Sequence, residues 1–202
     1  MKEQVNDPLL HIKTVGEQKG FNNSLHYHPY EPTPYKALEN LFGAYPLVST
    51  DRFVDFGCGK GRLSFTANYL FNAMVVGIEM NEVFYEAAVK NRNNYMKKFN
   101  RSKEKLPFHC SLAQEYKIHP LDNKFYFFNP FSIQIFIKVI HNILKSYEEF
   151  ERNMEVILYY GSQEYFYYLE DYTPFKLMDE IRLEKYESNP FEKFLIYRLS
   201  AN

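Results

Sequence analysis

The chain has 202 residues, 46% of them hydrophobic, and its 24 Lys and Arg against 25 Asp and Glu give a formal net charge of -1. This length suits one domain with a sizeable core, and a nearly neutral chain has no global field that attracts nucleic acid or an anionic membrane. The first residues, MKEQVNDPLLHIK, lack the apolar core of a signal peptide, and the chain has no charge-free run of about 18 residues for a membrane span. We therefore expect a cytoplasmic protein without membrane contacts.

The N-terminal segment, residues 1–29, is polar and shows neither the helical nor the strand period. Glycine and asparagine residues between positions 16 and 23 interrupt it. Such residues favour turns and open chain. We therefore predict a flexible N-terminal arm over 1–29, followed by a single domain over 30–202.

The domain is predicted to begin with a helix that follows the segment YEPTP, residues 30–34. Thr33 is a suitable N-cap and Pro34 a suitable first helical residue. The spacing of the apolar residues then indicates one buried stripe, made of Ala37, Leu38, Leu41 and Phe42.

Beyond this helix, predicted strands and helices alternate along the chain. In order they are strand 52–56, helix 61–71, strand 73–79, helix 81–100, strand 106–110, strand 124–131, helix 133–144, strand 154–160, helix 163–170, and strands 175–183 and 193–200. This order predicts an α/β, Rossmann-like three-layer sandwich with a mostly parallel seven-stranded sheet and a C-terminal antiparallel hairpin. Ligands of such sheets lie at the carboxyl ends of the strands, and the loop after the first strand is the usual cofactor loop.

That loop contains three glycines in alternate positions, Gly57, Gly59 and Gly61. Glycines there can take positive φ and let a ligand approach the main chain; a tight turn without a ligand is the alternative. Residue 62 is Arg, so the spacing is GxGxG and differs from the GxGxxG of dinucleotide sites.

Two acidic residues accompany the glycines. Asp55 lies two positions before Gly57, where its carboxylate can organise the loop amides or reach a cation. Glu79 ends the second strand, 18 residues after Gly61, where a carboxylate can accept hydrogen bonds from both hydroxyls of a ribose. The pattern indicates an adenosyl ligand that carries positive charge.

The stretches VDFGCGKG and GIEM resemble the first and second motifs of the class I S-adenosylmethionine-dependent methyltransferases. The resemblance implies S-adenosyl-L-methionine as cofactor, with its methionine moiety held by Asp55, Gly57, Gly59 and Gly61, its ribose by Glu79 and its adenine by Met80. The third motif of the family falls at Leu112 and Ala113, which the resemblance implies are also cofactor-binding residues, and CSLAQEY lacks the acidic residue often found near the adenine amino group.

The stretch FFNPF, residues 127–131, is similar to the Asn-Pro-Pro-aromatic motif of methyltransferases that modify planar amino groups. The similarity implies that Asn129 and Pro130 place the acceptor amine, although the second proline is absent and Ser132 replaces the aromatic residue. A strand end with a proline turn is the alternative. With Y-x-P-T at residues 30–33, these motifs also resemble a group of small bacterial and mitochondrial methyltransferases, some of which modify protein lysines.

These patterns predict transfer of a methyl group to an amine nitrogen of a protein lysine or another amino group, without a metal, and a protein or a small molecule is the favoured acceptor. RNA is a further candidate acceptor, because seven Lys and Arg lie between residues 90 and 105, although a solvated helix face and loop is the commoner reason for such a run. A protein that binds an adenosyl ligand without catalysis is one competing hypothesis. An NAD-dependent oxidoreductase is a second, disfavoured because Arg62 stands where a small residue is expected.

Overall fold

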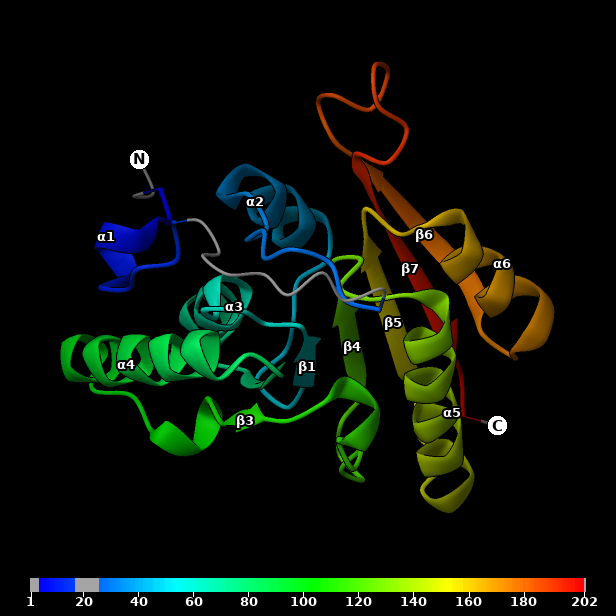
Figure 1. Cartoon of the computed structure of the whole chain (residues 1–202), viewed down its shortest axis with the longest axis horizontal. Coiled ribbons are helices and arrows are strands. Elements are labelled where there is room, and N and C mark those ends of the chain that lie inside the picture. The colour runs from blue at the N-terminus through cyan, green and yellow to red at the C-terminus, as the bar shows by residue number, and fades with distance from the viewer. Residues whose placement is uncertain (1–3, 17–25, 202) are drawn as a thin grey trace.

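The computed structural model describes residues 4–16 and 26–201 and contains a seven-stranded sheet flanked by helices (Figure 1). The strands are β1 Arg52–Phe56, β2 Met74–Glu79, β3 Phe108–Cys110, β4 Lys124–Phe127, β5 Met154–Tyr159, β6 Lys176–Arg182 and β7 Lys193–Leu199. Their order is β3-β2-β1-β4-β5-β7-β6; β7 is antiparallel to β5 and β6, and the other pairs are parallel. The predicted fold class is confirmed.

Helices cover both faces of this sheet. They are α1 Asp7–Leu10, α2 Tyr35–Ala44, α3 Arg62–Phe71, α4 Glu82–Phe99, α5 Ile133–Glu149 and α6 Gln163–Tyr172, with short 3-10 turns η1 Lys103–Lys105 and η2 Ala113–Glu115. Residues of α1 to α4 share one hydrophobic core, and residues of α5 and α6 share the other. Adjacent residues of β1 contribute to different cores, Phe53 to the first and Val54 to the second, because successive strand side chains point to opposite faces.

Local chemistry explains where several elements begin and end. The Asn81 side chain accepts hydrogen bonds from Val83 N and Phe84 N, so Asn81 is the N-cap of α4. The prediction for Thr33 is wrong, since Pro34 is the N-cap of α2 and Thr33 Oγ1 instead lies 2.8 Å from the Tyr126 hydroxyl.

Strand β4 also ends earlier than predicted, at Phe127 instead of residue 131. Asn129 has φ +40°, a left-handed conformation that leaves the strand, and Pro130 has no N–H to donate to a sheet ladder. The chain therefore turns at Asn129, at the carboxyl edge of the sheet.

The predicted arm over 1–29 differs from the structure in its described part. Val5, Leu10, Ile12 and Thr14 are buried, and α1 packs near α3. A helix of four residues is too short to show a period, so the sequence predicts no element there. Residues 4–14 are thus packed against the domain predicted to begin at residue 30, and positions 17–25 lie outside the described residues.

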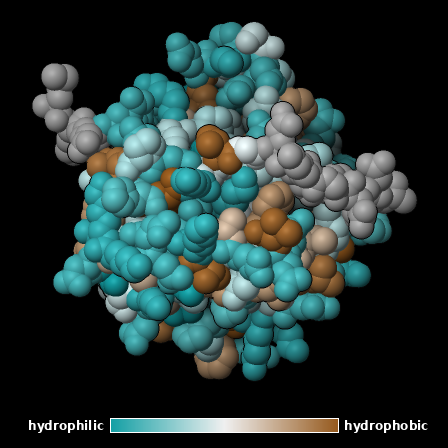
Figure 2. Space-filling model, turned by 60° about the vertical axis from the view of Figure 1, so that its left-hand side comes forward, coloured by the Kyte–Doolittle hydropathy of each residue, from teal (hydrophilic) through white to brown (hydrophobic). Residues whose placement is uncertain are grey.

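Twelve large hydrophobic side chains are exposed on the surface of the described residues. Figure 2 shows a mostly hydrophilic face on which hydrophobic residues form small, separate groups. None of the helices in residues 4–16 and 26–201 has both the length and the apolar character that crossing a membrane requires.

The strand order places a ligand site. From β1 the chain adds β2 and β3 on one side, and then crosses to add β4 and β5 on the other. The loops after β1 and β4 therefore diverge, which leaves a crevice at the carboxyl ends of these two neighbouring strands.

Candidate active site

A cleft that is partly open to solvent lies at this crevice, and the space in it, including the part open to solvent, is about 940 Å³. Its walls come from the loop after β1, the end of β2, the turns after β3 and β4, and residues 27–33. The predicted site residues among its lining are Asp55, Gly57, Glu79, Met80, Ala113 and Pro130. Gly59 and Gly61 lie on the same loop, but they are not among the lining residues, nor are Leu112 and Asn129.

The glycine loop needs glycine for two reasons. Gly57, Gly59 and Gly61 have φ of +77°, +54° and +87°, which L side chains rarely adopt. A Cβ at Gly57 would also lie 2.7 Å from Pro130 Cβ, and one at Gly59 would lie 2.1 Å from Tyr30 Cε2. The loop therefore packs directly against the turn after β4 and against Tyr30, and Gly61 caps α3.

Hydrogen bonds fix this loop to β2. Gly57 N and Cys58 N both donate to Ile78 O, at 2.9 and 3.0 Å. Gly59 N donates to Glu79 Oε2 at 2.8 Å, and Asn81 N donates to Glu79 Oε1 at 2.8 Å. The Glu79 carboxylate thus connects the loop to the start of α4.

Two buried carboxylates face the cleft. Asp55 is 4% exposed and accepts a hydrogen bond from Ser64 Oγ at 3.1 Å; Glu79 is 7% exposed. Burial raises the pKa of Asp55 to about 7, with a smaller contribution from the charge of Glu79, and burial also raises the pKa of Glu79. Within the described residues, neither carboxylate forms an ion pair, and no group of three or more His, Cys, Asp or Glu side chains is placed to hold a metal ion.

The wall of the cleft that contains Met80 and Ala113 is less polar than the wall that contains Asp55 and Glu79. Met80 lines it and is 43% exposed, and the buried Ala113 lies on the turn after β3. Leu112 precedes Ala113 as the N-cap of η2. The main chain holds this wall in place, because Ser111 N donates to Glu79 O at 3.1 Å.

The turn after β4 brings Pro130 into the cleft. Asn129 Oδ1 is buried and has no hydrogen-bond partner among the described residues. The Asn129 carbonyl oxygen lies 2.6 Å from His28 Nδ1. The turn is thus anchored through its main chain, while one buried side-chain acceptor is left unused.

Comparisons with known proteins agree with this architecture. No protein-family profile matches the chain. Over 64 residues it is 36% identical to a protein-lysine N-methyltransferase of Saccharolobus islandicus (strain REY15A). The match covers 31% of this chain and 40% of that protein, so the chain spans less than half of the length of this relative.

Several solved structures are similar over most of both chains. An RNA methyltransferase of Salinibacter ruber in complex with S-adenosyl-L-homocysteine has a TM-score of 0.56 and 20% identity, over 85% of this chain and 94% of that one. A putative RNA methyltransferase of Pyrococcus horikoshii has a TM-score of 0.58 and 18% identity, over 96% of both chains. The chain has a methyltransferase fold. A putative methyltransferase of Escherichia coli, with a TM-score of 0.59 and 14% identity over 93% of this chain and 92% of that one, has it too.

In this methyltransferase fold, residues 27–33 line the cleft, a contact that the sequence did not predict. His28 N donates to Pro130 O at 3.1 Å, and Ser132 N donates to His26 O at 2.9 Å. Tyr30 packs against Phe84 with ring centroids 4.7 Å apart. The Y-x-P-T motif at residues 30–33 is the one sequence signal for this segment.

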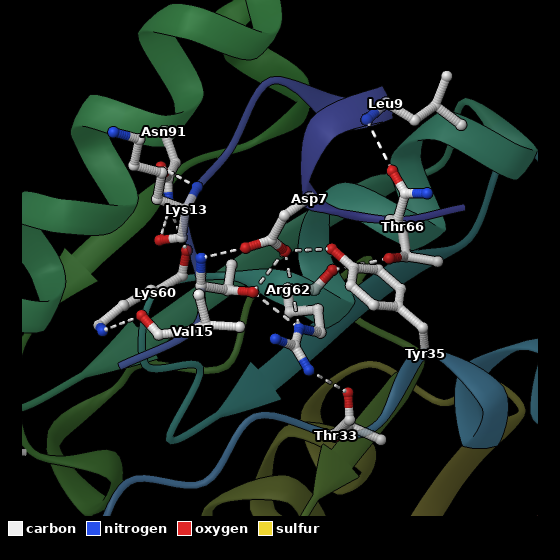
Figure 3. A network of polar contacts seen from close by, with 12 residues as sticks. Asp7, Leu9, Lys13, Val15, Thr33, Tyr35, Lys60, Arg62, Thr66 and Asn91 are labelled. Atoms are coloured by element: carbon white, nitrogen blue, oxygen red, sulfur yellow. Dashed lines mark hydrogen bonds and ion pairs between the residues drawn. The ribbon is translucent and has the colours of Figure 1, made fainter. Parts of the chain in front are cut away.

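A buried network joins the N-terminal residues to the site of the methyltransferase fold (Figure 3). Arg62, 8% exposed, donates from Nε to Thr14 Oγ1 at 2.7 Å and from Nη1 to Thr33 O at 3.3 Å. Asp7 accepts hydrogen bonds from Thr14 N and from the Tyr35 hydroxyl, each at 2.5 Å, and its Oδ1 lies 3.9 Å from Arg62 Nε. The first residue of α3 is therefore held by α1 and by the segment that lines the cleft.

Proposed function

We propose that this chain is an S-adenosyl-L-methionine-dependent methyltransferase that transfers the methyl group to an amine nitrogen. One observation carries the proposal: the left-handed glycine loop after β1 and the Glu79 carboxylate at the end of β2 line one cleft through Gly57 and Glu79, and a 2.8 Å hydrogen bond from Gly59 N to Glu79 Oε2 joins them. This combination provides main chain for close approach and an acceptor for ribose hydroxyls.

The charges of the cleft fit this cofactor. S-adenosyl-L-methionine carries a sulfonium and a net positive charge, and the cleft holds two buried carboxylates without an ion-pair partner among the described residues. A bound cation would favour their ionised forms. We assign the methionine moiety to Asp55 and the loop of Gly57, Gly59 and Gly61, the ribose to Glu79, and the adenine to Met80 and Ala113, with Leu112 supporting Ala113.

Methyl transfer requires mainly that the protein align the acceptor nitrogen with the methyl group. When bound, the cofactor supplies a methyl group that its sulfonium already activates. The chain holds the acceptor nitrogen in line with that methyl group and excludes water from both. Asn129 Oδ1 accepts a hydrogen bond from the acceptor N–H and so orients the nitrogen, which has lost its extra proton to water before it attacks.

The buried, unused Asn129 Oδ1 beside the cleft-lining Pro130 supports an amine acceptor. The local similarity to a protein-lysine N-methyltransferase supports the same class. RNA stays a second candidate acceptor, because similar solved structures include RNA methyltransferases. Two competing functions for the same cleft are adenosyl-ligand binding without catalysis and NAD-dependent oxidation.

Titration and transfer assays separate these functions. We expect binding of S-adenosylmethionine and S-adenosylhomocysteine but not NAD, and transfer of labelled methyl from S-adenosylmethionine to the protein fraction of a cell extract. Binding of NAD alone would indicate an oxidoreductase. Binding of S-adenosylhomocysteine without labelling of any fraction would indicate a binding protein.

Glu79→Ala is expected to weaken S-adenosylhomocysteine binding by about 10- to 100-fold. Hydrogen bonds to a charged acceptor contribute roughly 1.5–3 kcal/mol each, partly compensated by water. The variant also loses the bond from Gly59 N, so the loop becomes less ordered. Calorimetric titration measures the effect. Glu82→Ala, an exposed acid in the first turn of α4, is the matched control and should bind normally; an unchanged dissociation constant for Glu79→Ala would remove Glu79 from the site.

The preference for S-adenosylmethionine over S-adenosylhomocysteine should rise with pH. The pKa of Asp55 is raised by burial to about 7, so Asp55 is mostly neutral below that pH and ionised above it. Only the ionised form attracts the extra positive charge of the sulfonium. The ratio of the two affinities, measured between about pH 5.5 and 7.5, should therefore increase across the pKa, and Asp55→Asn should flatten this trend. An equally steep trend in Asp55→Asn would show that another group is responsible.

A further inference from the structure

A row of aromatic side chains continues from the cleft across the carboxyl edge of the sheet. Phe128 lines the cleft, and its ring centroid lies 4.6 Å from that of Tyr159 and 6.1 Å from that of Tyr160. Tyr160 in turn stacks with Phe191, at 6.0 Å between centroids and 27° between planes. Phe191 belongs to the β6–β7 loop, residues 183–192, and is 40% exposed.

The β6–β7 loop stands at the same edge as the cleft. Tyr159, the last residue of β5, pairs with Phe194 near the start of β7. The loop that leads into β7 therefore lies at the edge of the sheet where the parallel strand β5 ends. Figure 1 shows this loop projecting beyond the sheet at the end where β4 and β5 terminate. The aromatic row therefore connects the cleft, at Phe128, with this loop, at Phe191.

Backbone strain marks this row. Tyr160 has φ +54° directly after β5, as Asn129 has φ +40° two residues after the adjacent β4. A left-handed tyrosine is unusual, and such residues persist where the surroundings enforce them, often at functional sites. The Tyr160 hydroxyl is held by Asn189 Nδ2 of the β6–β7 loop, which fixes the ring between Phe128 and Phe191.

The charge around this row is negative. Glu31 lines the cleft, and Glu192 Oε2 accepts a hydrogen bond from the Tyr159 hydroxyl at 3.3 Å. Besides burial, which contributes most, the charges of Glu192 and Glu31 raise the pKa of the Tyr159 hydroxyl. Residues 183–192 hold three Glu and one Lys, which gives the loop a formal charge of -2.

Three neighbouring cations, Arg182, Lys193 and Arg62, are already engaged. Arg182 and Lys193, at the two ends of the loop, both contact Glu180, at 2.6 and 2.9 Å. Arg62, the cleft-lining arginine, is bound to Thr14 and Thr33. The surface therefore offers carboxylates and ring faces to an approaching ligand, which suits an ammonium and repels phosphate.

The basic residues between 90 and 105 do not change this conclusion. They lie on α4 and on the segment before β3. Strand β3 is one edge of the sheet, and β6 is the other edge. Several are also used within the fold: Arg92 donates to Leu106 O, and Arg101 and Lys105 donate to Asn72.

We propose that the acidic aromatic surface, defined as Glu31, Phe128, Tyr160, Phe191 and Glu192, binds a basic protein segment and guides one of its lysine side chains into the cleft. This inference rests on the proposed function. Once the lysine ammonium has released a proton to water, its nitrogen lone pair forms the new N–CH3 bond, and the electrons of the broken C–S bond stay on sulfur. The rings face the alkyl chain and its positive end, and the carboxylates attract the flanking basic residues.

The test uses the full chain with S-adenosylhomocysteine and three labelled probes of similar length: a Lys- and Arg-rich peptide, a Glu-rich peptide with one lysine, and a single-stranded RNA. Fluorescence anisotropy should show at least tenfold tighter binding of the basic peptide than of the other two. Labelled methyl should be transferred from S-adenosylmethionine to the basic peptide. Tighter binding of the RNA would overturn the proposal.

Two variants separate the surface from the rest of the protein. Glu31→Lys with Glu192→Lys should weaken peptide binding at least tenfold and should affect S-adenosylhomocysteine binding much less. Glu148→Lys with Glu149→Lys makes the same charge change on exposed residues at the end of α5 and should have little effect. Equal effects of the two pairs would overturn the proposal, because net charge would then explain the binding.

Tyr160→Asn tests the ring itself, since asparagine tolerates the left-handed backbone. The variant should transfer methyl groups to the basic peptide at least fivefold more slowly than the unmodified chain, while its affinity for the cofactor stays normal. An unchanged transfer rate would show that the Tyr160 ring is not part of the peptide-binding surface. If the unmodified chain does not bind S-adenosylhomocysteine, the proposed function fails. If it binds S-adenosylhomocysteine but not the basic peptide, the inference about this surface fails alone.

Discussion

Replacing Gly59 with valine is expected to reduce S-adenosylhomocysteine affinity by about 100-fold or more, since strain of roughly 1–3 kcal/mol and the loss of loop geometry act together. Gly59 has φ +54°, which a β-branched residue resists, and a Cβ there would lie 2.1 Å from Tyr30 Cε2. Tyr30 is held in place, because its hydroxyl donates to Thr14 O at 2.6 Å and its ring packs on Phe84. The loop must therefore move, and the bond from Gly59 N to Glu79 moves with it.

The matched control for this variant is Gly43→Ala. Gly43 lies in α2 with no atom within 4 Å of an added Cβ, so alanine should leave binding unchanged and stabilise the helix by up to about 1 kcal/mol. Calorimetry measures the affinities of both variants for S-adenosylhomocysteine. Circular dichroism on heating tests whether Gly59→Val still folds. Wild-type affinity in Gly59→Val would mean that the loop is a tight turn and does not hold the cofactor.

The sequence predicts most of the fold because its elements are defined locally. Buried strands such as Arg52–Phe56 and capped helices such as Glu82–Phe99 carry their pattern within a few residues. The differences arise where tertiary contacts compete with local preference. Thr33 is drawn away from the cap position by the Tyr126 hydroxyl, and residues 4–14 are ordered by contacts with α3 and α4 that their own sequence does not show.

The candidate site likewise combines residues that a local motif reveals with residues that only contacts between distant parts of the chain bring together. The glycine loop and Glu79 stand out because each belongs to a short motif at a strand end. Tyr30 reaches the loop from a segment without a predicted element, and Arg62 meets Thr14 across 48 positions of the chain. Contacts between such distant residues leave no local pattern, so a single sequence does not reveal them.

Removing the Asn129 side chain is expected to lower methyl transfer about 100-fold, because a misaligned nucleophile loses much of the advantage of proximity. Glycine is the informative replacement, since it adopts φ +40° without strain and removes the Oδ1 acceptor that is buried and unpartnered among the described residues. Pro130 should keep its contact with the glycine loop, so S-adenosylhomocysteine affinity should stay within about threefold of wild type, as expected when an interaction acts mainly on the transition state.

Two further variants make this prediction specific to the acceptor. Asn129→Asp keeps the shape and an acceptor oxygen but adds a negative charge, which should strengthen binding of the cationic S-adenosylmethionine while transfer falls. Asn100→Gly changes another left-handed asparagine, at the exposed C-cap of α4, and should alter neither quantity. Asn129 is not among the cleft-lining residues, so its side chain must turn toward the acceptor when the amine binds. Wild-type transfer rates in both Asn129→Gly and Asn129→Asp would show that the Asn-Pro stretch only ends strand β4, and the orientation of the acceptor nitrogen would have to come from another group.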